Sequence, residues 1–310
     1  MNRFTAILIL IFSFLLVGCS GASIKPDSDG LNVVASTTIV GDVVRQIGGD
    51  KISLEVLFPI GADPHTFEAR PQDVIAISNA DILFLNGLEL EHTLEPLIEA
   101  NAKGLVVEVS EGIEALPFED SHEESGSSEE GYDHAVGDPH VWMDPNNVQV
   151  WVQNIVKTLS DTDPDNKTYY SENGDKYLNE LANLNQWIRN EVININVNDR
   201  KLVTDHETFG YFADEYGFRV VGLVVNSITT GAAPSARELS ELEDKIKQQN
   251  VKAVFVGSTV SPTLAQQVAS DTGVKLVVLY TESLGAKDSG VDTYISYMKK
   301  NVELIVDGLN

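Results

Sequence analysis

The sequence is poor in cysteine and in basic residues. Its single cysteine, Cys19, has no partner in the chain for an internal disulfide. The 21 Lys and Arg residues are outnumbered by 47 Asp and Glu residues, which gives a formal net charge of −26 at pH 7. This balance argues against nucleic acid as a partner, because nucleic-acid binding needs a basic surface that displaces counterions. It suits a cationic ligand.

Long hydrophobic runs are also absent, except at the N-terminus. The run from Phe4 to Val17 spans about 14 residues, short of the roughly 20 that cross a bilayer as a helix. With Arg3 before it, this run predicts a signal peptide over residues 1–18. Leu16-Val17-Gly18-Cys19 resembles the bacterial lipobox, so we expect a lipid on Cys19 to anchor the mature chain outside the cytoplasm, on the periplasmic side if the cell has two membranes.

After residue 31, short β-branched runs alternate with helical patterns, which predicts an α/β fold with buried parallel strands. We expect two lobes, each with a central parallel sheet flanked by helices, joined by one long backbone helix. The predicted division is a lipidated tether over 19–30, an N-terminal lobe over 31–160, the connecting helix over 161–195 and a C-terminal lobe over 196–310. Within the C-terminal lobe, one helix is predicted from Glu207 to Tyr216.

Residues 119–138 interrupt this alternation. They are rich in Asp and Glu, contain His122 and His134, and have no Lys or Arg and few apolar residues. Such a composition cannot bury enough apolar surface to fold by itself, so we expect a mobile acidic loop in the N-terminal lobe. The two loop histidines are either weak metal collectors or solvated polar residues, and the second interpretation is favoured.

The tripeptide Asp-Pro-His occurs twice, at Asp63 to His65 and at Asp138 to His140, in a chain with only 6 histidines. Asp-Pro is also ordinary turn chemistry, so either histidine alone could be an exposed turn residue. The proline before each histidine restricts the backbone conformation there, and a side chain held in place loses less entropy when a ligand binds. The preceding Asp63 and Asp138 are candidates to orient the rings as hydrogen-bond acceptors.

Three further positions strengthen a metal hypothesis. His65, His206 and Glu282 each follow a predicted strand, and ligands bind beyond the carboxyl ends of parallel strands. With His140, which precedes a predicted helix from Pro145, they form a complete tetrahedral set for Zn²⁺. Taken singly, His206 could be a helix-capping or buried histidine and Glu282 a solvated acid. His92 is predicted to be an exposed residue at a helix start.

The chain resembles the metal-specific substrate-binding lipoproteins of bacterial ABC transporters for zinc and manganese. The resemblance covers essentially the whole mature chain. It is carried by the lipobox and by the segments ADPHTFEARPQDV, FLNGLELEHTLEPLI, GDPHVWMDP, LVTDHETFGYFADEYG, PSARELSELEDKIKQQNVKAVF and TESLG. One departure is VFVGSTVSP, because similar proteins commonly carry an acid near Gly257 or Ser258.

The resemblance implies two lobes with one metal ion bound between them, and its ligand positions fall on His65, His140, His206 and Glu282. It also implies a membrane permease and an ATPase as partners, and this chain has no GxxxxGK[ST] motif that could cradle a nucleotide. Three imidazoles with one carboxylate favour Zn²⁺, with Mn²⁺ as the alternative, since Mn²⁺ sites carry more oxygen ligands. Manganese-type members carry a carboxylate at the position of His206.

Two functions of another class remain open on the sequence. A zinc hydrolase would need an open coordination position and a general base, for which Glu68 and Glu207 are candidates because they lie near proposed ligands. A surface adhesin would use the lobes only as a scaffold. We expect a monomeric binding protein without enzymatic activity, because four protein ligands would close the position that a catalytic water needs.

Overall fold

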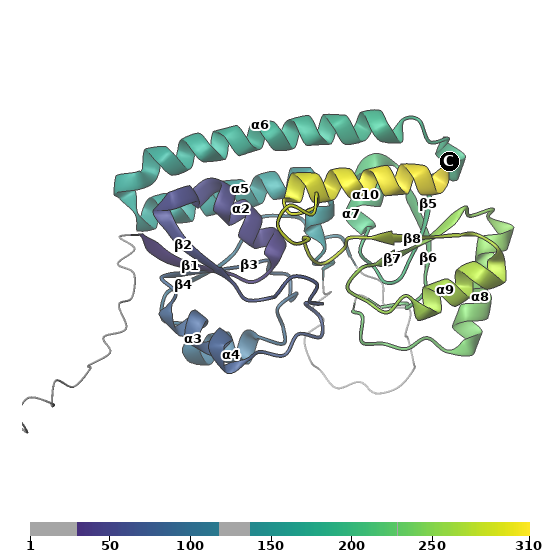
Figure 1. Ribbon diagram of the computed structural model, residues 1–310, viewed down its shortest axis with the longest axis horizontal. Helices are drawn as coiled ribbons and strands as arrows, with labels where there is room; N and C mark the ends of the chain where they lie inside the picture. The colour runs from purple at the N-terminus through teal and green to yellow at the C-terminus, as the bar shows by residue number, and fades with distance from the viewer. Residues whose placement is uncertain (1–29, 118–136, 228) are drawn as a thin grey trace, which may run out of the picture.

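The computed structural model describes residues 30–117, 137–227 and 229–310. The predicted signal peptide, the lipidation site Cys19, the tether up to residue 29 and nearly all of the acidic loop, with His122 and His134, lie outside these residues. The described part forms two α/β lobes side by side, with long helices running across both (Figure 1). The predicted fold class is therefore confirmed.

The first lobe contains a four-stranded parallel sheet in the order β2-β1-β3-β4. The central strands are buried on both faces, as expected for strands covered by helices on either side, and β3 is buried at all of its residues. Its elements are β1 (Leu31–Ala35), α2 (Thr38–Gly48), β2 (Ile52–Val56), α3 (Pro71–Asn79), β3 (Ile82–Leu85), α4 (Glu95–Asn101) and β4 (Leu105–Glu108).

The second lobe contains two parallel pairs, β5-β6 and β7-β8, with β5 lying beside β7. Strand β7 is buried at every residue, and each pair runs in parallel, so the carboxyl ends of the strands lie together. Its elements are β5 (Lys201–Thr204), α7 (Gly210–Tyr216), β6 (Arg219–Leu223), α8 (Ala236–Gln248), β7 (Ala253–Gly257), α9 (Thr263–Thr272), β8 (Lys275–Leu279) and α10 (Tyr294–Leu309).

The helix predicted from Glu207 begins at Gly210 instead. The intervening residues turn away from strand β5, because the Thr204 hydroxyl donates to the carbonyl of His206 at 2.9 Å and the Glu207 amide donates to the carbonyl of Ser227 at 3.1 Å. These bonds commit the carbonyl of His206 and the amide of Glu207 to partners outside a helix. The prediction of the helix start was therefore wrong by three positions. The turn that replaces the first helical residues sets the direction of the His206 side chain.

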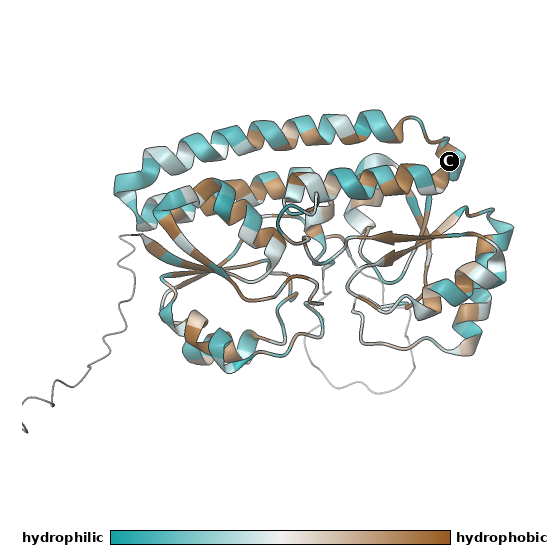
Figure 2. Cartoon of the chain, viewed as in Figure 1, coloured by the Kyte–Doolittle hydropathy of each residue, from teal (hydrophilic) through white to brown (hydrophobic). Residues whose placement is uncertain are grey.

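Two helices follow the acidic loop: α5 (Pro145–Thr162), capped by the side chain of Asp144, and α6 (Lys167–Val192). At 1.5 Å per residue, α6 is about 39 Å long. It packs against α2, α5 and α10, and so contacts both lobes (Figure 1). Figure 2 shows it largely hydrophilic, with hydrophobic residues toward these helices. The buried positions recur at helical spacing: Tyr170, Gly174, Tyr177, Leu181, Leu184, Ile188 and Val192.

The hydrophobic core is shared between the lobes. One cluster of buried side chains runs from the first sheet through α5 and α6 to Phe255 and the helix α10. Two smaller clusters lie under the other face of each lobe, around Leu83 in the first and Val254 in the second. The shared cluster fixes the strand ends of one lobe opposite those of the other, which is where the candidate site lies.

Candidate metal centre

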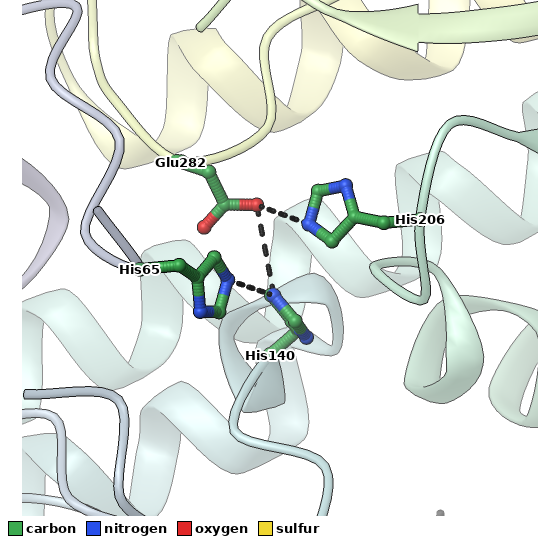
Figure 3. Close-up of side chains that lie close together, drawn as sticks. All are labelled: His65, His140, His206 and Glu282. Atoms are coloured by element: carbon green, nitrogen blue, oxygen red, sulfur yellow. Dashed lines mark hydrogen bonds and ion pairs between the residues drawn. The ribbon is translucent and has the colours of Figure 1, made fainter. Parts of the chain in front are cut away.

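Four side chains from separate parts of the chain converge at the boundary between the lobes (Figure 3). His65 lies between β2 and α3, and His140 directly precedes the short 3-10 turn Val141–Met143. His206 follows β5 and Glu282 follows β8, both at carboxyl ends of parallel strands. All four are buried, and the structure brings together the four residues that the sequence predicted to form one tetrahedral set.

The donor atoms are close enough to share one ion. The Nε2 atoms of His65 and His140 are 3.2 Å apart. Glu282 Oε1 lies 3.4 Å from Nε2 of His206 and 3.7 Å from Nε2 of His140, and all four donor atoms lie within 4.8 Å of one another. Donors around a tetrahedral ion with bonds of 2.0 to 2.1 Å are about 3.3 Å apart. The cluster therefore has approximately the spacing that a four-coordinate ion requires.

The carboxylate of Glu282 has unused hydrogen-bonding capacity. Its side chain is only 3% exposed, and neither of its oxygens accepts a hydrogen bond from any residue that the structure describes. Its nearest charged partners are the two imidazole nitrogens at 3.4 and 3.7 Å. A buried carboxylate without hydrogen bonds costs several kcal/mol unless a cation compensates it. The site is therefore suited to a cation.

The protonation states differ among the four groups. Burial lowers the pKa of His65 to about 3, so its imidazole is neutral and ready to coordinate. Burial also acts to lower the pKa of His206, but the neighbouring carboxylates of Asp205 and Glu282, at 3.2 and 3.4 Å from its ring nitrogens, outweigh it and raise the pKa to about 10. For Glu282, burial acts to raise the pKa, yet electrostatic attraction to the neighbouring imidazoles of His140 and His206 lowers it to about 2. The cluster thus holds a buried ion pair of His206 and Glu282.

A carboxylate lies behind each of two rings, and Asp138 fixes the orientation of the His140 ring. Asp138 Oδ1 lies 2.7 Å from Nδ1 of His140, and because a carboxylate only accepts, Nδ1 carries the proton and Nε2 is free to bind an ion. Asp205 Oδ2 lies 3.2 Å from Nδ1 of His206. The sequence analysis did not nominate Asp205; the signal available was the Asp-His pair at the end of a strand.

Asp63 differs from Asp138 although both precede Pro-His. Its Oδ1 accepts from the backbone amide of His65 at 3.0 Å, and its Oδ2 accepts from the hydroxyls of Thr66 and Thr230. No bond to the His65 ring is found among the described residues. The hypothesis that both aspartates orient rings therefore holds for Asp138 only.

The remaining candidates lie elsewhere or outside the described chain. His92 is exposed in a turn before α4 and is not part of the cluster. Glu68 is exposed, and Glu207 is partly buried with its pKa raised by burial and by Asp138. In the described ranges 30–117, 137–227 and 229–310, no helix is long and apolar enough to cross a membrane.

Two α/β lobes bridged by a long helix, with three imidazoles and a carboxylate buried between them, define a two-lobed metal-binding protein. The chain belongs to the family described as zinc-uptake complex component A, periplasmic, whose sequence model matches residues 33–308. The chain is thus the substrate-binding component of a metal ABC transporter, and the resemblance found in its motifs is confirmed.

The names of proteins similar to this chain state different metals. The manganese-binding lipoprotein MntA of Halalkalibacterium halodurans is 36% identical over 306 residues, covering 97% of each chain. The manganese ABC transporter substrate-binding lipoprotein PsaA of Streptococcus pneumoniae is 32% identical over 321 residues, covering 100% of each. The periplasmic zinc-binding protein TroA of Treponema pallidum superposes with a TM-score of 0.79 at 26% identity, covering 90% of this chain and 99% of TroA.

Proposed function

We propose that this protein captures Zn²⁺ with His65, His140, His206 and Glu282 and delivers it to a membrane permease driven by a separate ATPase. The observation that carries this proposal is the cluster itself: four buried donor atoms within 4.8 Å of one another, with a carboxylate that lacks hydrogen bonds. The metal is cargo here and must be released.

The choice of zinc rests on the donor set. Zn²⁺ accepts imidazole and carboxylate ligands in a tetrahedron, and the donor separations of 3.2, 3.4 and 3.7 Å are close to the edge length of such a tetrahedron. In a site of this composition, Zn²⁺ binds more tightly than Mn²⁺ by the Irving–Williams order. The description of the family and the name of TroA agree with zinc.

Manganese is the second candidate, and specific observations favour it. The names of MntA and PsaA state manganese, and these relatives match this chain over nearly its whole length. Both oxygens of Glu282 lack hydrogen bonds from the described residues, so both could bind one ion and raise the number of donors to five. An oxygen-richer site with more than four donors suits Mn²⁺ better than a strict tetrahedron does.

The test is the metal content and affinity of the purified protein. We expect mass spectrometry to find one zinc per chain, and competition with a chromophoric chelator to give a lower Kd for Zn²⁺ than for Mn²⁺. His140→Ala and His206→Ala should each weaken zinc binding by at least about 100-fold, because each removes a donor that a closed site cannot replace. The matched control is His92→Ala, which removes an exposed histidine outside the cluster.

The outcomes separate the two metals. Manganese in the purified protein, with the tighter Kd for Mn²⁺, would move the proposal to the second candidate. Unchanged zinc affinity in both ligand variants would refute the site. Because four protein donors fill a tetrahedron, we propose no catalytic water and no enzymatic activity.

We also propose that the mature chain is a monomer anchored to the outer face of the cytoplasmic membrane by a lipid on Cys19. The lipobox supports the lipid anchor, as do the names of MntA and PsaA as lipoproteins. Cys19→Ala should release the protein from the membrane fraction without changing its metal affinity, since residues 33–308 carry the family match. Membrane retention of that variant would contradict the lipid anchor.

A further inference from the structure

A hydrogen bond links the segment carrying His140 to the segment carrying Glu282. The indole Nε1 of Trp142 donates to the carbonyl of Thr281 at 3.1 Å, although 139 positions separate the two residues. Trp142 lies two positions after His140, and the Thr281 carbonyl belongs to the same peptide unit as the amide of Glu282. The bond therefore ties the Trp142 side chain, in the His140 segment, to the backbone next to Glu282 in the other lobe.

Tyr297 of helix α10 completes this connection. Its hydroxyl donates to the same Thr281 carbonyl at 2.5 Å and accepts from Trp142 Nε1 at 3.2 Å. Trp142 and Tyr297 are both buried, so water does not compete for these bonds. We call the Thr281 carbonyl with the side chains of Trp142 and Tyr297 the interlobe bridge.

The interlobe bridge is itself held on both sides. The carbonyl of Trp142 accepts from the Tyr294 hydroxyl at 2.7 Å, and the Tyr294 amide donates to Asp42 of helix α2 at 2.9 Å. The Trp142 ring also lies edge-on to the His140 ring, with centroids 5.2 Å apart and planes at 66°. Motion of Trp142 would therefore disturb the orientation of His140 as well as the position of Glu282.

We propose that Trp142 and Tyr297 are positioning residues that set the separation of His140 and Glu282 and thereby determine which ions fit. This inference rests on the proposed function of the four-residue cluster. In the structure Nε2 of His140 and Oε1 of Glu282 are 3.7 Å apart. Adjacent donors lie about 3.3 Å apart around a tetrahedral ion and only about 3.0 Å apart around an octahedral ion with bonds near 2.1 Å. By holding His140 and Glu282 at the wider separation, the interlobe bridge favours tetrahedral over octahedral coordination.

The experiment compares Tyr297→Phe with wild type in zinc affinity, manganese affinity and the visible spectrum of bound Co²⁺, which reports coordination geometry. The substitution keeps the ring and removes the hydroxyl. We expect about a tenfold loss of zinc affinity, the size typical of losing a group that orients a ligand. Manganese affinity should change much less, so the preference for zinc over manganese falls, and the Co²⁺ spectrum should shift.

The matched control is Tyr170→Phe. Tyr170 is also buried, and its hydroxyl bonds to Asp163 near the junction of α5 and α6, away from the metal site. A purely structural effect would lower both metal affinities equally or resemble the control, and either result overturns the inference. If Tyr297→Phe does not fold, Trp142→Phe removes the indole donor and decides the same comparison. If wild type binds no metal, the proposed function fails instead.

Discussion

Asp138 Oδ1 accepts two hydrogen bonds from His140, one from the ring Nδ1 at 2.7 Å and one from the backbone amide at 2.9 Å. One carboxylate oxygen thus fixes both the backbone and the ring of a proposed ligand. Tyr211 donates to the carbonyl of Asp138 at 2.7 Å and holds this segment against the second lobe. The direction in which His140 Nε2 points is therefore set before any ion arrives.

Removing the carboxylate should weaken metal binding. We expect Asp138→Ala to lose about 10- to 100-fold in zinc affinity, because His140 keeps its donor atom but loses its fixed tautomer and orientation. Chelator competition measures the change. Asp163→Ala serves as the control, since Asp163 bonds to Tyr170 far from the cluster. Equal affinities for Asp138→Ala and wild type would show that the hydrogen bond does not orient the ligand.

Metal binding should release a proton. In the metal-free protein the pKa of His206 is raised to about 10, so the imidazole is charged at neutral pH, yet a metal ligand must be neutral. We expect about one proton released per Zn²⁺ near pH 7.5, and a zinc affinity that rises about tenfold per pH unit up to pH 9. Calorimetry in two buffers of different ionisation enthalpy counts the proton. Identical heats in both buffers would contradict this prediction.

The stability of the metal-free protein should follow from the same two groups. The pKa of His206 is raised from 6.5, so its contribution is complete below pH 6.5 and is lost as the pH rises through about 10. The pKa of Glu282 is lowered from 4.5, so its contribution is complete above pH 4.5 and is lost as the pH falls through about 2. Both contributions are complete together only between pH 4.5 and 6.5.

Gly257 should be intolerant of a side chain. A Cβ there would lie 2.3 Å from the hydroxyl oxygen of Thr281 and 3.2 Å from Oδ2 of Asp205, the residues next to Glu282 and His206. We expect Gly257→Ala to displace both neighbours and to weaken zinc binding by about tenfold. Gly231→Ala is the control, because its Cβ meets nothing within 4 Å. Wild-type affinity in Gly257→Ala would mean that the two neighbours can move without disturbing the ligands.

A hydrogen bond between the lobes should slow the loss of metal. Thr230 donates to Oδ2 of Asp63 across 167 positions, next to His65. We expect Thr230→Val to raise the rate of zinc dissociation about threefold to tenfold, since a typical intramolecular hydrogen bond contributes about 0.5 to 1.5 kcal/mol net. Stopped-flow transfer to a chelator measures the rate. Thr66→Val is the matched control, because Thr66 donates to the same oxygen from within the first lobe; equal rates for the two variants would exclude a role for the contact between lobes.

The sequence predicted the fold class and the four clustered residues for physical reasons that are local. Alternating strands and helices place polar residues at strand ends, and His206 and Glu282 are found there. The different roles of Asp63 and Asp138 were not predictable, because the identical Asp-Pro-His motifs meet different neighbours, Thr230 in one case and the ring of His140 in the other.

The interlobe bridge could not be predicted from the sequence either. The contact between Trp142 and Thr281 joins positions that only the folded core brings together, and no local pattern in either segment signals it. The start of α7 was misplaced for a related reason: the turn before it depends on a bond to Ser227, which lies beyond the helix in the sequence.

Helix α6 restricts how the protein can give up its cargo. The buried side chains of α6, spread along about 39 Å, pack against helices of both lobes. A wide rotation of one lobe relative to the other would therefore break part of this packing and expose apolar side chains to water. At about 25 cal/mol per Å², exposing even 200 Å² costs about 5 kcal/mol, comparable to much of a protein's total stability. We therefore expect that release of a bound ion involves small displacements of the turns that carry His65 and His206, while the two lobes keep their relative orientation.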